Sequence, residues 1–179
     1  MKTLLLILSI VCAFNLKAQQ LKLTNAVIIA QFEKEEDRYA MQALFTSILQ
    51  DQQIKTLPLL NVLKQGEDLQ HLMADSIQSL LLQKGYDTYF VVNVRGYDRT
   101  FKPSTDAQTL TELLETTSIY QIYRDEATSV SFEFSIYQKN QLISRQVLRC
   151  GNVSDRDSVL KRLRKRFVKK VLPQLLGKV

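Results

Sequence analysis

The spacing of the hydrophobic residues changes repeatedly along this chain, and these changes restrict the fold more than any composition value does. Residues 26–32 are a short apolar, β-branched run, which predicts a buried strand. From Glu35 onward the apolar residues recur with the spacing of one side of a helix (Met41, Leu44, Phe45, Ile48, Leu49). The two patterns then repeat, with an apolar segment at 54–63, a second helix over 69–81 and a strand over 88–94 that is apolar on both faces.

The resulting order is β-α-β-α-β, which predicts right-handed crossovers and helices that cover the sheet. The strand over 88–94 is expected to be central, because both of its faces are apolar. Pro58 has no backbone N–H to donate, so we expect its strand to lie at an edge of the sheet or to begin after it. Gly85 is expected to end the second helix.

The last third of the chain has the pattern of a hairpin followed by a helix. From Val130 to Tyr137 apolar residues alternate with Ser131, Glu133, Ser135 and Tyr137, which predicts a strand with one solvated face. A turn at Lys139-Asn140 leads into a second strand over 142–150. Residues 96–128 are less regular, with a short helix expected after Asp106 and a brief strand or packed loop at 119–123. We therefore predict an α/β fold over residues 19–179, a single mixed-sheet domain with a hairpin and a long basic C-terminal helix.

The first residues have the pattern of an export signal. A basic start, an apolar run from Leu4 to Phe14 and a small residue before a polar stretch predict a signal peptide over residues 1–18. The run is too short to span a bilayer, which needs roughly 20 residues. A buried N-terminal helix is one alternative, and a lipid anchor on Cys12 is another, although Val11 directly before it fits poorly. We therefore expect an exported protein of the periplasm or cell envelope.

Few residues suited to familiar catalysis remain in such an exported chain. The five glycines are too far apart for a P-loop or a dinucleotide-binding turn. His71 and Cys150 are too few for a zinc site, and no GxSxG elbow supplies a nucleophile, while a Cys–His pair stays open. Asp87 and Asp98 lie at opposite ends of one strand and cannot share an ion. We predict no metal and no cofactor, and an enzyme is the less favoured interpretation. Cys150 is expected to be buried or to pair with another molecule.

The C-terminal helix carries the excess positive charge. Ser154 is expected to cap it and Asp157 to complete a capping box. Its buried side is expected to contain Leu160, Leu163, Phe167, Val171 and Leu175, broadened by Val159, Val168 and Leu172. Its polar side includes Arg162, Lys165, Arg166 and Lys169. Residues 155–170 have a net charge of +6, whereas the rest of the chain from residue 19 onward sums to −2.

Three interpretations of this basic face are open. The first is a solvated face whose cations suit the C-terminal half of a helix dipole. The second is a surface that binds anionic lipid or envelope polymer, and the third is a nucleic-acid site. The last is disfavoured, because exported proteins rarely meet nucleic acid and no aromatic residue lies between the cations.

A second candidate contact follows the predicted central strand. Arg95, Tyr97, Arg99 and Lys102 lie at its carboxyl end, where α/β sheets tend to bind ligands. They are expected to form an anion-binding rim, with Tyr97 as a contact surface. The alternative is that arginine and aspartate side chains simply pair across a tight turn at Gly96.

The element order, three strands alternating with two helices and then a hairpin and a long terminal helix, resembles small bacterial envelope domains. Examples are the amino-terminal domain of the Tol translocation protein TolB and the lipoprotein activators of penicillin-binding proteins. The order also resembles uncharacterised secreted proteins of the same layout. The resemblance implies a non-enzymatic binding or accessory protein that docks on an envelope protein or an anionic surface. A small-ligand binding module and a hydrolase with an unrecognised carboxylate site are the alternatives.

Overall fold

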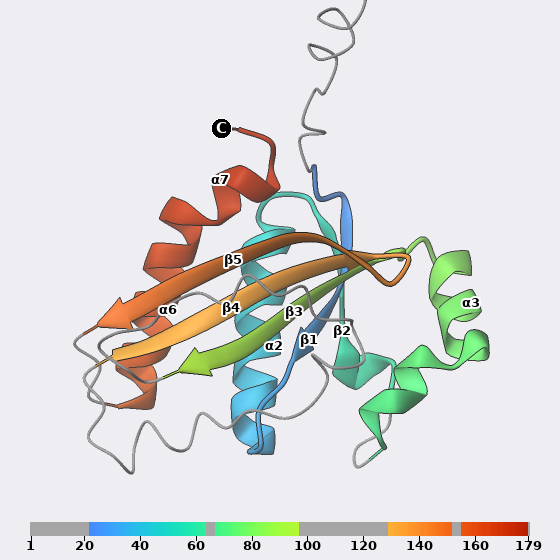
Figure 1. Cartoon of the computed structure of the whole chain (residues 1–179), viewed down its shortest axis with the longest axis horizontal. Coiled ribbons are helices and arrows are strands. Elements are labelled where there is room, and N and C mark those ends of the chain that lie inside the picture. Colours follow the sequence, from blue (N-terminus) through green and yellow to red (C-terminus); the bar gives the residue numbers. More distant parts are fainter. Residues whose placement is uncertain (1–21, 64–66, 97–128, 152–154, 179) are drawn as a thin grey trace, which may run out of the picture.

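Five strands form one mixed sheet in the order β2-β1-β3-β4-β5 (Figure 1). The computed structural model describes residues 22–63, 67–96, 129–151 and 155–178 of the 179-residue chain. β1 pairs in parallel with both β2 and β3, and the pairs β3–β4 and β4–β5 are antiparallel. The strands are β1 (Asn25–Ala30), β2 (Lys55–Pro58), β3 (Thr88–Gly96), β4 (Ser129–Gln138) and β5 (Gln141–Gly151). The α/β fold with a mixed sheet, a hairpin and a C-terminal helix is thus as predicted, and β3 is the central strand.

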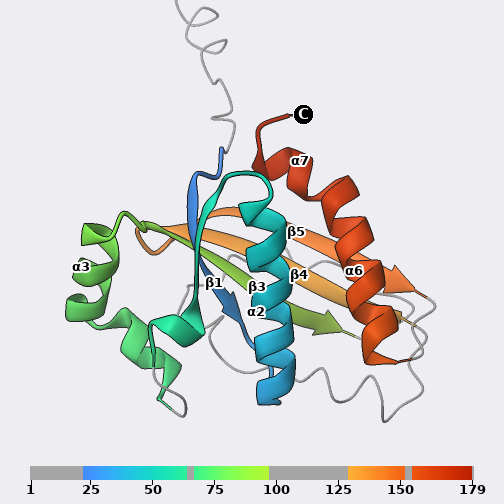
Figure 2. The same cartoon turned by 180° about the vertical axis from the view of Figure 1, so that it is seen from behind.

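Helices cover both faces of the sheet. Figure 2 shows α2 (Glu35–Gln50) and α6 (Arg156–Lys170) side by side on one face, with the short α7 (Leu172–Leu175) after α6. Two 3-10 helices, η1 (Leu59–Asn61) and η2 (Leu69–Met73), and α3 (Asp75–Gln83) pack on the opposite face near β1 and β3. The parallel strands explain this division: β2 lies on one side of β1 and β3 on the other, and right-handed crossovers in opposite directions place their helices on opposite faces.

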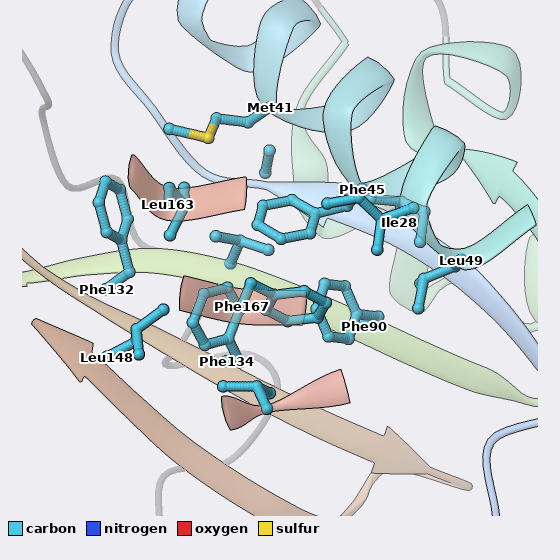
Figure 3. Close-up of a cluster of buried hydrophobic side chains, with 14 of the residues drawn as sticks. Ile28, Met41, Phe45, Leu49, Phe90, Phe132, Phe134, Leu148, Leu163 and Phe167 are labelled. Atoms are coloured by element: carbon cyan, nitrogen blue, oxygen red, sulfur yellow. The ribbon is translucent and has the colours of Figure 1, made fainter. Parts of the chain in front are cut away.

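Four aromatic rings join the two large helices to the sheet (Figure 3). They are Phe45 from α2, Phe90 from β3, Phe134 from β4 and Phe167 from α6, all fully buried. The Phe167 ring centroid lies 4.9 Å from that of Phe45 and 5.0 Å from that of Phe134. These tilted and edge-on arrangements are favourable for aromatic pairs. α6 is therefore anchored in the core by one side and leaves its polar side to solvent.

The second predicted helix is interrupted. Instead of one helix over 69–81, the 3-10 helix η2 ends before Ala74, whose ψ of 133° is extended, and α3 begins after it. Leu80, an apolar residue of the predicted helix, is 46% exposed. Gly85 does end the helix: its φ is +79°, and Tyr86 donates to the Leu81 carbonyl, as in a Schellman motif.

The hydrophobic segment at 54–63 contains a shorter strand than predicted. β2 spans only four residues, and the chain continues directly into η1. Pro58 is the last residue of this strand, which lies at an edge of the sheet as its missing N–H requires.

The hairpin is as predicted, but the solvated face of its first strand is not. Lys139 and Asn140 both have positive φ, which is the backbone of a two-residue hairpin turn. The expectation that Ser131, Glu133, Ser135 and Tyr137 face solvent is wrong, because all four are buried. Tyr137 packs with Leu72 and Leu81 in the hydrophobic cluster on the face of the sheet that η2 and α3 cover. Glu133 is covered by two arginines, which are described with the site below.

The N-cap of α6 is Asp155 rather than Ser154. The Asp155 carboxylate accepts from the Ser158 backbone N–H at 2.7 Å, and the Ser158 hydroxyl accepts from the Asp155 N–H at 3.1 Å. Ser158 therefore completes the capping box in place of Asp157. Ser154, residues 1–18 and the elements expected between residues 97 and 128 lie outside the described residues. Within the described part, no helix is both long and apolar enough to span a membrane.

Candidate anion-binding surface

Five cationic side chains on α6 surround one hollow in the protein surface. Its volume is about 330 Å³, and we call it the cationic hollow; it is lined by Arg162, Lys165, Arg166, Lys169 and Lys170. The helix brings these side chains together because they are spaced three or four residues apart. All five are exposed. Four of them are the helix residues that the sequence analysis singled out, and Lys170 is the addition.

The opposite side of α6 carries cations that are neutralised by α2. The Arg156 guanidinium lies 3.1 Å from the Asp37 carboxylate and 3.5 Å from that of Glu36. Arg164 lies 3.8 Å from Asp51 at the end of the same helix. α2 thus supplies the acidic partners of one side of α6.

The cations of the hollow differ from Arg156 and Arg164 in their partners. Among the described residues, none of its five side chains forms an ion pair with a carboxylate. The neighbouring strand β5 has two arginines, Arg145 and Arg149, and no acidic residue. The uncompensated charge of α6 is therefore concentrated along the side that faces the β5 edge of the sheet.

Arg166 is the cation of the hollow with a fixed position. Its Nη1 donates to the carbonyl oxygen of Arg149 on β5 at 2.6 Å. The Arg149 side chain in turn donates to the Ser129 hydroxyl from Nη2 at 3.2 Å. A guanidinium has five N–H donors, so this bond orients Arg166 and leaves donors for an anion.

Crowding of like charges on one helix side has an energetic cost. Lys165 and Lys169, like Arg162 and Arg166, stand four residues apart, a spacing at which like charges destabilise a helix by roughly 0.2–0.5 kcal/mol per pair. The helix dipole favours Lys169 and Lys170 in the last turn but falls off within that turn. It therefore does not account for Arg162, Lys165 and Arg166. A bound anion would relieve the repulsion among all five.

The second predicted contact is only partly described. The Arg95 guanidinium lies 3.2 Å from the Glu133 carboxylate, which Arg145 approaches to 3.4 Å from β5. The Glu133 side chain is only 2% exposed, so burial requires such partners. Tyr97, Arg99 and Lys102 lie outside the described residues.

Sequence reasoning missed the cluster of Arg95, Glu133 and Arg145. The turn at residues 139 and 140 sets a register in which Ser135 would oppose Ser144, so that Arg145 would lie on the other face of the hairpin. An irregularity between Ile136 and Tyr137 shifts the pairing by one residue, and Glu133 then pairs with Val147 and Ser135 with Arg145. Arg145 reaches the face of Glu133 only through this shift, for which the alternation of apolar and polar residues gave no signal.

Groups with reactive potential are dispersed or buried. Cys150 lies in the core beneath α6, and burial raises the pKa of its thiol to about 11, although Arg166 and Arg162 oppose the shift. His71 is exposed on η2 at the other face of the sheet, so the Cys–His pair does not form. Among the described residues, no group of three or more His, Cys, Asp or Glu side chains is arranged to hold a metal.

The Asp87 carboxylate is held in place by hydrogen bonds within the sheet. Burial alone would raise its pKa, but hydrogen bonds from Asn25, Thr88 and Gln138 outweigh burial and hold the pKa below its ordinary value. Asn25 and Gln138 donate to the Asp87 carboxylate at 2.9 and 2.7 Å. Because these partners come from β1, β3 and β4, the carboxylate joins three adjacent strands.

Comparison with known proteins gives weak structural similarities. No family model matches the sequence, and no curated protein matches it. The fold is similar to the lipoprotein GNA1162 from Neisseria meningitidis, at 12% identity over 83% of this chain and 96% of that chain, with a TM-score of 0.47. A PelC dodecamer from Paraburkholderia phytofirmans matches at 10% identity over 88% of this chain and 90% of that chain, with a TM-score of 0.42. Protein XCC0632 from Xanthomonas campestris, a DUF330 protein, matches at 7% identity over 91% and 86%, with a TM-score of 0.37.

These similarities to bacterial proteins are weak and concern topology alone. At these identities and TM-scores we take neither a family nor a function from them.

Proposed function

We propose that this protein is an exported, non-enzymatic accessory protein that docks on an anionic surface of the cell envelope through the cationic hollow. The observation that carries the proposal is the contrast between the two sides of α6. Arg156 and Arg164 have carboxylate partners on α2, whereas the five cations of the hollow have none among the described residues.

The composition of the hollow favours a charged lipid or polymer over a protein partner. Its lining contains cations alone, without an apolar or aromatic side chain. The centre of a protein–protein interface is instead depleted in charged residues and enriched in aromatic ones. Near an anionic membrane each Lys or Arg contributes about 1 kcal/mol, so five cations on one surface are enough for reversible docking.

A vesicle sedimentation assay tests the proposal. The probe is phosphatidylcholine vesicles with a minor fraction of phosphatidylglycerol, at low salt. Lys165→Glu combined with Lys169→Glu should weaken binding by at least about thirtyfold, since two cations near the surface are lost and reversed. Both side chains are exposed, so the fold should be retained.

The matched control combines Lys139→Glu with Lys161→Glu. Lys139 lies in the hairpin turn and Lys161 outside the hollow, and both are exposed. This variant has the same net charge as the first, so it should keep most of the binding if the hollow is the docking surface. Equal losses of binding in the two variants would show that net charge alone, and not the hollow, determines binding. Absence of binding by the unmodified protein would contradict the proposal outright.

A further inference from the structure

We infer that the cationic hollow is a site for the phosphomonoester headgroup of a lipid. The inference rests on the proposed function and makes it more specific: a phosphomonoester is recognised in preference to a phosphodiester of the same surface charge. Three features of the hollow carry it, namely its size, its charge and the arginine pair within it.

The hollow has the size of a site for one headgroup. Its volume of about 330 Å³ is at the lower end of the range of roughly 300–1,000 Å³ that small-ligand pockets occupy. The hollow is partly open to solvent, and its five cations concentrate their field on a charged group that enters it.

The charge of the hollow exceeds what one phosphodiester neutralises. Five cations line it, without a carboxylate partner among the described residues. A phosphodiester brings a single negative charge, whereas a phosphomonoester near neutral pH carries about −1.5 to −2 on three acceptor oxygens. The doubly charged group therefore gains more in a site where several cations repel one another.

Two arginines in the hollow have a geometry that suits a phosphoryl group. Arg162 and Arg166 stand one helical turn apart, so both guanidinium groups reach the same hollow. Arg166 is already oriented by its bond to the Arg149 carbonyl at 2.6 Å, which reduces the entropy that binding would otherwise cost. Planar guanidinium groups match phosphoryl oxygens with paired hydrogen bonds, which a lysine ammonium cannot reproduce.

The experiment compares two sets of vesicles whose surface potentials are matched by electrophoretic mobility. One contains phosphatidic acid and the other phosphatidylglycerol. We expect the unmodified protein to bind the phosphatidic acid vesicles about tenfold more tightly, because one additional hydrogen bond to a charged group is worth about that factor.

Two charge-conserving variants separate geometry from charge. Arg166→Lys keeps the net charge but removes the planar donor group, so it should reduce the preference to the part that charge alone provides, while binding to phosphatidylglycerol vesicles is retained. Arg164→Lys, on the side of α6 that faces α2, is the matched control and should keep the preference.

The outcomes distinguish the inference from the proposed function. Equal binding to both vesicle types by the unmodified protein overturns the inference and leaves docking on an anionic surface intact. No binding to either type overturns both. Glycerol 3-phosphate is the soluble probe: if it binds without vesicles as tightly as phosphatidic acid vesicles do, the lipid source is wrong. A preference that Arg166→Lys reduces and Arg164→Lys keeps supports the inference.

Discussion

Cys150 illustrates how burial decides the chemistry of a single residue. The sequence allowed either a buried thiol or a disulfide to another molecule. In the structure the thiol is free and fully buried in the core between β5 and α6. Burial disfavours the thiolate and raises the pKa to about 11, because the nearby Arg166 and Arg162 compensate only in part. The reactive form is therefore nearly absent near neutral pH.

Alkylation should distinguish the folded from the unfolded thiol. In a chain that begins at residue 19, Cys150 is the only cysteine. We expect iodoacetamide at mildly alkaline pH to leave the native protein unmodified and to add one label after unfolding in guanidinium, as read by intact mass. Rapid, stoichiometric labelling of the native protein would contradict a buried thiol.

At the scale of elements, the junction of α2 and α6 depends on a charged contact at its edge. Arg156 bonds to the Asp37 carboxylate and to the Glu36 carbonyl oxygen. Burial raises the pKa of Asp37 above its ordinary value, while Arg156 and Lys34 lower it in part. The folded state thus binds a proton at Asp37 more readily than the unfolded state, and Arg156 limits the cost of keeping this carboxylate charged.

Replacing Arg156 with alanine should destabilise the protein in a pH-dependent way. We expect a loss of about 2 kcal/mol at neutral pH, less than for a fully buried pair because Arg156 is partly exposed. Without Arg156 the folded pKa of Asp37 rises further. The penalty should therefore shrink as the pH falls toward the ordinary value of 3.8 and Asp37 takes up a proton.

Urea unfolding at neutral pH and again near pH 3.8 measures this change. Arg164→Ala is the control, because its pair with Asp51 is exposed and should contribute no more than about 0.5 kcal/mol. A penalty for Arg156→Ala that grows on acidification would contradict the role assigned to Asp37.

At the scale of the whole molecule, the aromatic cluster fixes the position of the helix that carries the cationic hollow. Phe167 contacts rings from α2, β3 and β4, so the helix that bears the hollow is anchored to the sheet and to the helix beside it. The hollow is thereby held beside the edge strand β5, where the bond between Arg166 and the Arg149 carbonyl forms.

Phe167→Ala should cost about 3–5 kcal/mol, as truncation of a fully buried aromatic residue does. The neighbouring Val168→Ala is the control. Val168 was expected on the buried side of the helix but is 43% exposed, so its truncation should change the free energy of unfolding by no more than about 0.5 kcal/mol. Chemical denaturation followed by circular dichroism measures both. Similar stabilities for the two variants would show that α6 is not anchored by this ring.

Most of the architecture follows from local spacing. The period of the apolar residues predicts β1, α2, β3, the hairpin and α6, because a helix and a strand repeat differently along the chain. Pro58 and Gly85 mark an edge strand and a helix end through backbone chemistry alone. The break at Ala74 was not predictable in this way, since the apolar spacing over 69–81 suits one continuous helix.

The sequence by itself determined which residues of α6 are cationic and which side of the helix is buried. Only the tertiary structure decided which of those cations are neutralised, because the acidic partners Asp37 and Asp51 come from α2, more than a hundred residues earlier. The packing of α6 between α2 and the β5 edge places carboxylates on one side and an arginine-bearing strand on the other. For the same reason Glu133 became a buried ion-pair partner, since strand pairing brings Arg95 and Arg145 to it. The sequence specifies where the charged residues are, but whether each one is paired with an opposite charge depends on which distant elements come into contact.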